Sequence, residues 1–307
     1  MSKKNKYRPL DEHEIHHYKV KRRKPNRSIA GDIFLYFFLA LLSLIFVFPL
    51  FYTVCNAFKP LDELLKFPPD IMPRNPTGRN FSDLFVILSQ QSLVPFSRYL
   101  FNTLFITVVG TFCHVIFGSM AGYVLAKYDF PGGRAFFSLV VTGMLFGSYV
   151  TGIPNYLIMC KLHMIDTYWS LIIPSIGTAT SMFLMKQFME GFPTSLIEAA
   201  KIDGAKEWTI FMKLVMPNVK PAWLTMTILS VQGLWNNTAT TNIYTENKKM
   251  LAYAMQQITA ATGSTAEIAR MGAQAAVGVV MMVVPISLFI FSQSQIMETM
   301  ATSGLKD

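Results

Sequence analysis

The segment 194–221 holds the most ordered set of polar residues in the chain, and its chemistry is that of a binding surface. Ser195 and Glu198 stand three positions apart, the spacing of a capping box in which a hydroxyl and a carboxylate satisfy free amides at a helix start. Asp203-Gly204 is expected to stop that helix, because glycine tolerates a left-handed turn. The spacing therefore predicts a short capped helix followed by a glycine elbow.

A second helix is predicted after the elbow, and two prolines, Pro217 and Pro221, are expected to close the segment before the next apolar run. Its apolar face, at positions i, i+3, i+4 and i+7, would consist of Trp208, Phe211, Met212 and Val215. Two short helices joined by an elbow at a membrane surface would form a rigid protruding knob. Such a knob suits a groove on a partner protein.

A second polar set lies at the ends of apolar runs and consists of Asn155, Gln232, Trp235, Asn236 and Asn237. Amides beside an aromatic ring suit a sugar, whose hydroxyl groups need partners while its C–H face stacks on a ring. Gln232 and Asn236 are four apart and share a helix face, and Trp235 lies beside it. In lipid, the same groups serve equally well as hydrogen-bonding contacts between helices or as interface anchors. Both interpretations stay open.

Catalytic and cofactor chemistry has no signature in this sequence. It lacks a G-x-x-x-x-G-K-[ST] phosphate loop, H-E-x-x-H, G-x-S-x-G and a CxxC pair. Cys55, Cys113 and Cys160 lie in or beside apolar runs, as small buried hydrophobic residues do. His114 is a lone ionisable group in an apolar run, and a hydrogen-bonded helix contact is favoured over a transport role. We expect no catalytic residues, no metal site and no cofactor.

The composition places these segments in a membrane protein. Hydrophobic residues make up 52% and charged residues 15% of 307 residues, against about 25% charged for an ordinary soluble domain. The formal net charge is +9, but ten of the 27 Lys and Arg residues precede Gly31. This concentration fits a cytoplasmic tail against anionic membrane lipid and argues against a nucleic-acid partner.

Six apolar runs have about the length of membrane-spanning helices: 33–57, 99–126, 135–160, 168–185, 222–244 and 271–297. Six spans put both termini on the same side. That side, which includes the segment 194–221, carries 18 Lys and Arg residues against 9 on the other. The richer side is expected to be cytoplasmic, so both termini and this segment would face the cytoplasm of a bacterial cell.

The predicted organisation has five parts. A basic tail (1–31) precedes the first transmembrane helix (32–58) and an extracytoplasmic loop (59–95) whose six prolines suggest irregular structure. A five-helix core (96–297) contains the segment 194–221, and a short cytoplasmic tail (298–307) ends the chain. The polar stretch 245–270 of the core is expected to include a short surface helix.

The segment 194–221 resembles, residue for residue, the EAA motif of binding-protein-dependent ABC importer permeases. Glu198, Ala199 and Ala200 stand where that family has E-A-A, and Gly204 stands at its glycine. The ending I-x-L-P is matched by Leu214, Met216 and Pro217, with two apolar-for-apolar departures. In the family, this loop is the coupling helix that inserts into a cleft of the ATP-hydrolysing subunit, and Asp203 falls within it here.

The resemblance extends over some 250 residues in shared order. Short matches to carbohydrate-type permeases occur at Phe48-Pro49-Leu50, Asn102-Thr103, Phe130-Pro131-Gly132, Thr167-Tyr168 and Gly304-Leu305-Lys306. The branch resembled is that of the smaller permease of the maltose importer. The resemblance implies an all-α integral membrane protein with six transmembrane helices, a type I ABC importer (MetI-like) permease core with cytoplasmic coupling helices.

The resemblance also implies function and partners. The chain would form half of the translocation path for a sugar or oligosaccharide in the cell membrane. Its partners would be a second homologous permease, a dimer of ATP-binding subunits and an extracytoplasmic solute-binding protein. Two alternatives remain at this point: a self-sufficient secondary carrier or channel, which missing mid-membrane charges disfavour, and a membrane-embedded enzyme, which lacks any nucleophile, base or metal cluster.

Overall fold

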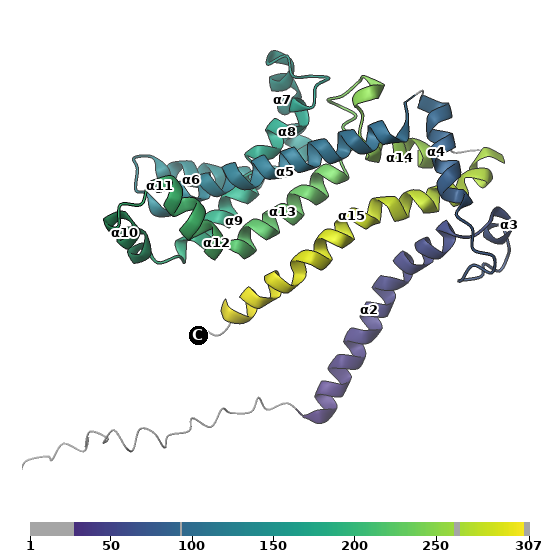
Figure 1. The fold of residues 1–307 in the computed structure, drawn as a ribbon, viewed down its shortest axis with the longest axis horizontal. Coiled ribbons are helices and arrows are strands. Elements are labelled where there is room, and N and C mark those ends of the chain that lie inside the picture. Colours follow the sequence, from purple (N-terminus) through teal and green to yellow (C-terminus); the bar gives the residue numbers. More distant parts are fainter. Residues whose placement is uncertain (1–27, 93, 261–264, 304–307) are drawn as a thin grey trace, which may run out of the picture. The chain divides into compact units, whose positions relative to one another are not determined.

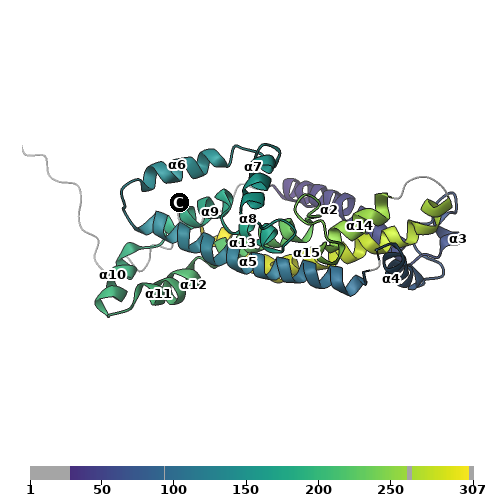
Figure 2. The same cartoon turned by 90° about the horizontal axis from the view of Figure 1, so that it is seen from above.

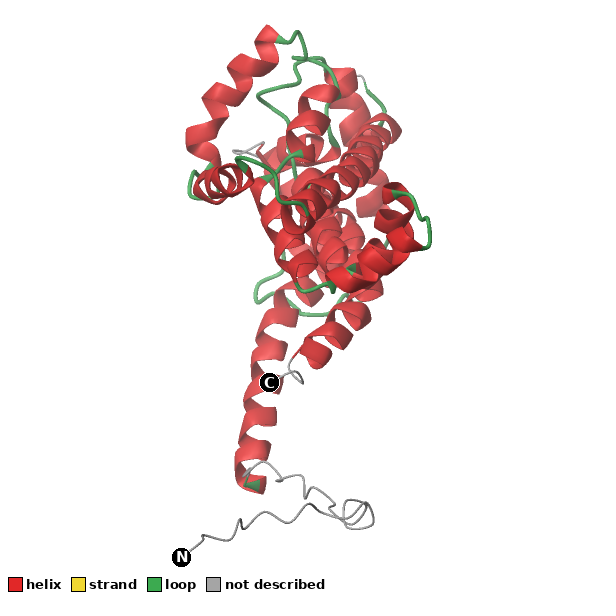
Figure 3. Ribbon diagram, turned by 90° about the vertical axis from the view of Figure 1, so that its left-hand side faces the viewer, coloured by secondary structure: helices red, strands yellow, loops and turns green. Residues whose placement is uncertain are grey.

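The computed structural model describes residues 28–92, 94–260 and 265–303, and all regular structure within these ranges is helical (Figure 3). The predicted all-α class is therefore confirmed. The basic tail up to residue 27 and the last four residues lie outside the described ranges. The chain forms two compact units, residues 1–51 and 52–307, which are described separately.

The first unit contains most of helix α2 (Ile29–Ala57, 29 residues). Its side chains are apolar on every face, and large residues such as Phe34, Phe37 and Phe46 are exposed. A helix that is hydrophobic all round must be covered by lipid or protein. At 1.5 Å per residue, α2 is about 44 Å long, which exceeds the roughly 30 Å hydrocarbon core of a bilayer. The first predicted span is confirmed as long enough to cross a membrane.

Two further helices of the described chain have the length and apolarity to cross a membrane. One is α5 (Phe96–Lys127, 32 residues) and the other is α15 (Thr265–Ser303, 39 residues), whose apolar part is Arg270–Ser294. Helix α15 runs past the predicted span end at residue 297. Three of the six predicted runs thus form continuous helices that are long and apolar enough to span a membrane.

The other three runs are broken or shorter than expected, so the count of six spans remains a prediction. The third run divides into α6 (Gly133–Gly143) and α7 (Ser148–Lys161), with Gly143 and Gly147 at the break. The fourth divides into α8 (Trp169–Ile176) and α9 (Ala179–Glu190) at Gly177. Glycine is a poor helix former, and Thr178 Oγ1 caps the restarted helix by accepting from Ser181 N (3.4 Å). The fifth run forms α13 (Lys220–Trp235), which ends nine residues before the predicted end.

Helix α5 is the centre of the second unit and packs against α8, α9 and α13 (Figure 1). Small residues on α5 allow these neighbours to approach closely. A Cβ atom added at Gly122 would lie 2.5 Å from Met185 Cβ on α9, and one at Gly110 would lie 2.7 Å from Leu234 Cδ1 on α13. Close backbone approach through small residues is the usual way in which membrane helices associate.

The two ends of α5 carry different structures, as the perpendicular views in Figures 1 and 2 both show. Helices α10 (Thr194–Ile202), α11 (Glu207–Thr209) and α12 (Met216–Asn218) lie near its carboxyl-terminal end. Helices α4 (Arg79–Ser92) and α14 (Leu251–Ala260) lie near its amino-terminal end. The predicted coupling segment and the predicted extracytoplasmic segments are therefore at opposite ends of the unit.

The segment 59–95 is more ordered than its prolines suggest. It contains α3 (Leu61–Leu64) and the 14-residue helix α4, so the expectation of irregular structure throughout is wrong. Five of the six prolines lie before residue 77, and none lies within α4. The irregular stretch between the helices is held by Glu63, whose carboxylate accepts from Arg74 N and Asn75 N, both at 2.9 Å.

The predicted short helix in 245–270 is α14, but it is a core element rather than a surface one. Leu251 and Ile258 are fully buried and pack in one cluster with α5 and α15 residues. The preceding turn is tied to α5 because Asn102 Nδ2 donates to the carbonyls of Asn247 and Lys249, both at 2.9 Å. The apolar side chains Leu251, Ala254, Met255 and Ile258 recur at helical spacing, but this spacing does not tell whether lipid or protein covers them.

Candidate functional site

The elbow of the predicted coupling segment has the expected backbone conformation. Gly204 has φ +80°, and α10 ends in the Schellman pattern: Gly204 N donates to Lys201 O and Ala205 N donates to Ala200 O, both at 3.0 Å. Asp203 occupies the C-cap position. A side chain on Gly204 would meet no atom within 4 Å, so only the backbone conformation requires glycine here.

The start of α10 differs from the prediction. The helix begins at Thr194 with Pro193 as its N-cap residue, and no side chain caps it. Ser195 therefore lies inside the first turn, and the predicted Ser195–Glu198 capping box is wrong. Pro193 explains the shift, because its extended conformation (φ −62°, ψ 124°) ends the preceding segment directly at Thr194.

The second helical stretch also departs from the prediction, because residues Ile210–Val215 form a π-helical turn. The wider turn changes which side chains face inward. Trp208 and Met212, predicted to lie on the apolar face, are exposed, whereas Phe211 and Val215 are buried as expected. Pro217 lies inside the helical run rather than closing it.

The inward face of the segment packs on a cluster formed with α5 and α9. Members of this cluster include Tyr123, Met185, Met189, Ile197, Ile210, Phe211 and Val215. Two ring contacts join the layers, Tyr123 with Phe211 (centroids 5.5 Å apart) and Trp208 with Phe211 (5.7 Å). The apolar packing fixes the segment 194–221 to the end of the α5–α9 pair.

The outward face of α10 is exposed and includes Glu198, Ala199 and Asp203. Ile202 is 87% exposed, an unusual state for such a side chain, and it lies one helical turn from Glu198. Sequence reasoning missed Ile202, although its position opposite the buried Ile197 on a short helix is a signal. Of the other predicted coupling residues, Ala200 and Leu214 are half-buried and Pro217 is exposed.

A polar clamp closes the angle between α10 and α11. Lys201 Nζ pairs with Glu207 Oε1 at 2.6 Å, and Tyr128 Oη donates to Glu207 Oε2 at 2.5 Å. The hydrogen bond from Lys201, followed by that from Tyr128, holds the pKa of Glu207 below its ordinary value. Because Tyr128 follows the last residue of α5, the clamp links the elbow directly to the central helix. These three residues were not singled out by sequence.

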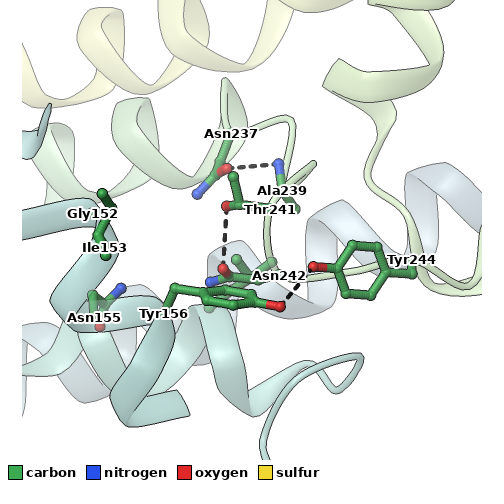
Figure 4. A pocket seen from close by; sticks show the side chains of 10 residues that line it. Gly152, Ile153, Asn155, Tyr156, Asn237, Ala239, Thr241, Asn242 and Tyr244 are labelled. Carbon is green, nitrogen blue, oxygen red and sulfur yellow. Dashed lines mark hydrogen bonds between the residues drawn. The ribbon is translucent and has the colours of Figure 1, made fainter. Parts of the chain in front are cut away.

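A pocket lined by both polar and apolar residues, with a volume of about 670 Å³, lies beyond the carboxyl-terminal end of α13 (Figure 4). Helix α7 contributes Asn155 and Tyr156, and the segment that follows α13 contributes the remaining polar side chains. The lining residues are Gly152, Ile153, Asn155, Tyr156, Leu171, Asn237, Ala239, Thr241, Asn242 and Tyr244. Two predicted substrate-path residues, Asn155 and Asn237, are therefore brought together although 82 positions separate them.

The hydrogen bonds around this pocket leave several polar atoms available. Asn237 Oδ1 accepts from Ala239 N at 2.8 Å, and the Asn237 amide nitrogen makes no hydrogen bond to any residue that the structure describes. Thr241 Oγ1 donates to Asn242 Oδ1 at 3.2 Å and can still accept. The hydroxyls of Tyr156 and Tyr244 are 3.1 Å apart and form a hydrogen bond with each other (Figure 4). The pocket thus offers both donors and acceptors.

The carboxylate of Asp166 forms hydrogen bonds to the segment at the rim of the pocket. It accepts from Thr245 N (2.9 Å), Tyr244 N (3.1 Å) and Thr245 Oγ1 (2.5 Å), and Lys248 Nζ lies 3.2 Å away. Partial burial raises the pKa of Asp166, but the hydrogen bonds from Thr245 and Tyr244 outweigh it and hold that pKa well below its usual range.

Two residues at this pocket have a strained backbone, Asp166 (φ 61°) and the lining residue Ala239 (φ 55°). In the described chain, the other positive-φ residue that is not glycine is His163 (φ 53°). Such conformations cost free energy and persist where the surrounding contacts enforce them, often at functional sites.

A second cavity of about 580 Å³ lies among α5, α8, α9 and α13, and Asn237 lines both cavities. His114 also lines it, and its Nδ1 lies 2.5 Å from Ser175 O on α8. The expected hydrogen-bonded helix contact of His114 is confirmed. Ser175, Thr178, Ser181 and Ser230 add hydroxyl groups to the wall.

Three other predicted substrate-path residues lie outside both cavities. Trp235 is 1% exposed and its Nε1 donates to Met281 O (3.1 Å), so of the two interpretations left open for this residue the structure supports the contact between helices. Gln232 and Asn236 are exposed, and Asn236 Nδ2 donates to Gln232 O at 2.9 Å. Trp235 is buried because α15 and the α14 cluster cover it, which spacing along α13 does not reveal.

Comparison with known proteins decides the family. Residues 114–299 match the family model described as binding-protein-dependent transport system inner membrane component. The chain belongs to this family. The arabinooligosaccharides transport system permease protein AraQ of Bacillus subtilis is 30% identical to this permease over 289 residues, 93% of this chain and 99% of the relative.

Two further proteins are similar to the permease. The polygalacturonan/rhamnogalacturonan transport system permease protein YtcP of Bacillus subtilis is 30% identical over 69% of this chain and 72% of its own. A crystal structure of a bacterial ABC transporter involved in the import of the acidic polysaccharide alginate matches with a TM-score of 0.73 at 23% identity, covering 89% of this chain and 99% of that chain. The latter likeness supports the fold.

Family membership settles several expectations. The permease is a non-catalytic membrane component of a binding-protein-dependent import system, and the ATPase resides on a separate subunit. The self-sufficient carrier or channel and the membrane-embedded enzyme are thereby excluded. The transmembrane location and the dependence on other transporter subunits and a substrate-binding protein are those of the family.

Proposed function

We propose that the permease forms half of the translocation path for a sugar or oligosaccharide and couples to its ATPase through the segment 194–221. The names of two relatives, which transport arabinooligosaccharides and polygalacturonan or rhamnogalacturonan, support the saccharide class. The observation that carries the coupling role is the exposed face of α10, held rigidly by the Gly204 elbow and the Glu207 clamp.

The assembly proposed for this chain comprises a second homologous permease, a dimer of ATP-binding subunits and an extracytoplasmic solute-binding protein. A single permease with one knob suits one ATP-binding subunit, so two permeases would serve two. The exposed Ile202 with Glu198 beside it offers an apolar side chain and a charge to a partner surface.

The orientation proposed places both termini and the segment 194–221 in the cytoplasm, with lipid around the apolar helices. The excess of Lys and Arg in the predicted inner segments, 18 against 9, supports it. The pocket beyond α13 then opens near the extracytoplasmic end. Asn155 and Asn237, together with the second cavity, are the part of the predicted path that this arrangement supports.

The coupling role can be tested with Glu198→Ala. Glu198 caps no helix and is exposed, and alanine is the better helix former, so the assembled transporter should be obtained in normal amounts. If Glu198 contributes about 1.4 kcal/mol or more at the ATPase interface, ATP-driven uptake should fall about tenfold or more.

Asp62→Ala is the matched control, because Asp62 is an exposed acidic residue on α3 near the other end of the unit. Its uptake should equal that of the unaltered protein. Normal uptake by the Glu198→Ala transporter would remove the coupling role from α10.

A further inference from the structure

The pocket beyond α13 has a chemical character that narrows the substrate class. None of its lining residues is an acid or a base, apart from the two tyrosine phenols. Its polar groups are three amides, a threonine hydroxyl and those phenols, and its volume of about 670 Å³ is within the range of about 300–1,000 Å³ typical of small-molecule sites. The lining is thus that of a site for an uncharged, hydroxyl-rich ligand.

We propose that this pocket binds one unit of a neutral saccharide and discriminates against uronate-containing, acidic saccharides. The proposal rests on the proposed function, since it assigns a substrate class to the path of the same transporter. The proposed preference for neutral saccharides would distinguish this permease from similar proteins whose names or descriptions include acidic polysaccharides.

The pocket can recognise the hydroxyl groups of a sugar because several of its side chains have donors or acceptors without a partner among the described residues. The Asn155 side-chain amide makes no hydrogen bond within the described part of the chain, and it projects from α7 at the pocket wall (Figure 4). Opposite it, the Asn237 amide nitrogen is a donor and Thr241 Oγ1 is an acceptor. A sugar hydroxyl both donates and accepts, so it can pair with either kind of group.

The ring of Tyr244 supplies the apolar surface that a sugar's C–H face needs. It is 56% exposed and is fixed at both ends. Its backbone N donates to Asp166, and its hydroxyl bonds to that of Tyr156. A ring held in this way loses little conformational freedom when a ligand packs against it.

The discrimination against acids follows from the charges at the rim. An ion pair formed by Asp166 and Lys248 lies beside the pocket, because the Asp166 carboxylate accepts from the backbone N of the lining residue Tyr244. Lys248 Nζ is engaged by the carbonyl oxygen of Asp166 (2.6 Å) as well as by its carboxylate. The carboxylate of a uronate that enters the pocket would lose its water of hydration without forming an ion pair with a cation. Burying an unpaired charge in this way is unfavourable for binding.

The test uses the assembled transporter in nanodiscs without its binding protein, so that selectivity by the latter does not contribute. Binding of labelled arabinotriose, xylotriose and maltotriose is compared with binding of trigalacturonate by equilibrium dialysis. At least one neutral trisaccharide should bind about tenfold or more tightly than trigalacturonate. Asn155→Ala should weaken that binding about 2- to 12-fold, the effect of losing one hydrogen bond.

Further variants guard against a folding defect. Asn75→Ala removes an exposed amide outside the pocket and should bind like the unaltered transporter. Tyr244→Ala should weaken binding at least as much as Asn155→Ala, whereas Tyr244→Phe, which keeps the ring, should change it less than about threefold. Each variant is compared at equal yield of the assembled complex.

The outcomes separate the two proposals. Equal or tighter binding of trigalacturonate, no binding of any neutral trisaccharide, or identical behaviour of Asn155→Ala and Asn75→Ala would overturn the neutral-saccharide pocket. ATP-driven uptake by the complete transporter is measured in parallel. Uptake of trigalacturonate alone would leave the saccharide importer standing, whereas uptake of neither class would overturn the proposed function itself.

Discussion

Replacing Gly204 isolates the contribution of one backbone angle to coupling. The residue has φ +80° at the elbow between α10 and α11, and a Cβ atom placed there meets nothing within 4 Å. Packing therefore contributes nothing to the cost of a side chain. The whole penalty comes from the left-handed conformation, about 1–2 kcal/mol for an ordinary L-residue.

The penalty predicts a ranked series of variants. Gly204→Asn should have the smallest conformational penalty, because asparagine tolerates the left-handed backbone conformation. Gly204→Ala should raise the free energy of this conformation by about 1–2 kcal/mol, and the β-branched side chain of Gly204→Val should raise it further. The matched control is Gly191→Ala in the turn before α10, where φ is −72° and a Cβ atom would meet only Phe188 O at 3.6 Å. That control should be close to neutral.

Co-purification of the ATPase subunit with the permease is the assay, since the elbow aims α10 rather than holding the whole bundle. A distortion of 1–2 kcal/mol corresponds to about a 5- to 30-fold loss of affinity. Retention should fall in the order Asn, Ala, Val, while the thermal stability of the permease bundle itself changes little. Equal retention by Gly204→Val and Gly191→Ala would refute the argument that the positive φ directs the coupling helix.

Two further predictions concern the outer rim and the orientation. Because the pKa of Asp166 is lowered in the folded state, its stabilising contribution is present above the unfolded value of about 3.9 and is lost as pH falls through the folded value. The contribution of this carboxylate to the melting temperature should thus be constant between pH 5 and 8. Asp166→Asn should lower the melting temperature over that whole range. A melting temperature that changes steeply near pH 6 because of Asp166 would contradict this expectation. The orientation can be tested with Ser195→Cys in a background in which Cys113 and Cys160 are replaced by serine. A membrane-impermeant thiol reagent should label this variant in opened cells and not in intact cells. Labelling of intact cells would contradict the proposed orientation.

Local features of the coupling segment were predictable because they depend on neighbouring residues. The elbow closes through a hydrogen bond from Gly204 N to Lys201 O and another from Ala205 N to Ala200 O, which span three and five positions, and glycine is the residue that such a turn selects. The cap at Ser195 failed for an equally local reason, since Pro193 is the N-cap residue and the helix starts two residues earlier than predicted. The π-helical turn at Ile210–Val215 has no comparable local signal, and it changed the buried face.

The membrane class, the apolar runs and the elbow of the segment 194–221 could be predicted from the sequence, because hydrophobicity and turn chemistry act over a few residues. Tertiary structure alone decided what each polar or aromatic side chain meets. Trp235 was covered by α15, and Ile202 was left exposed. Asn155 met Asn237 across 82 positions because the chain breaks at Gly147 and again after Trp235, which brings α7 beside the end of α13. Such contacts depend on how helices that are far apart in sequence pack together, and the spacing of residues along one helix does not predict this packing.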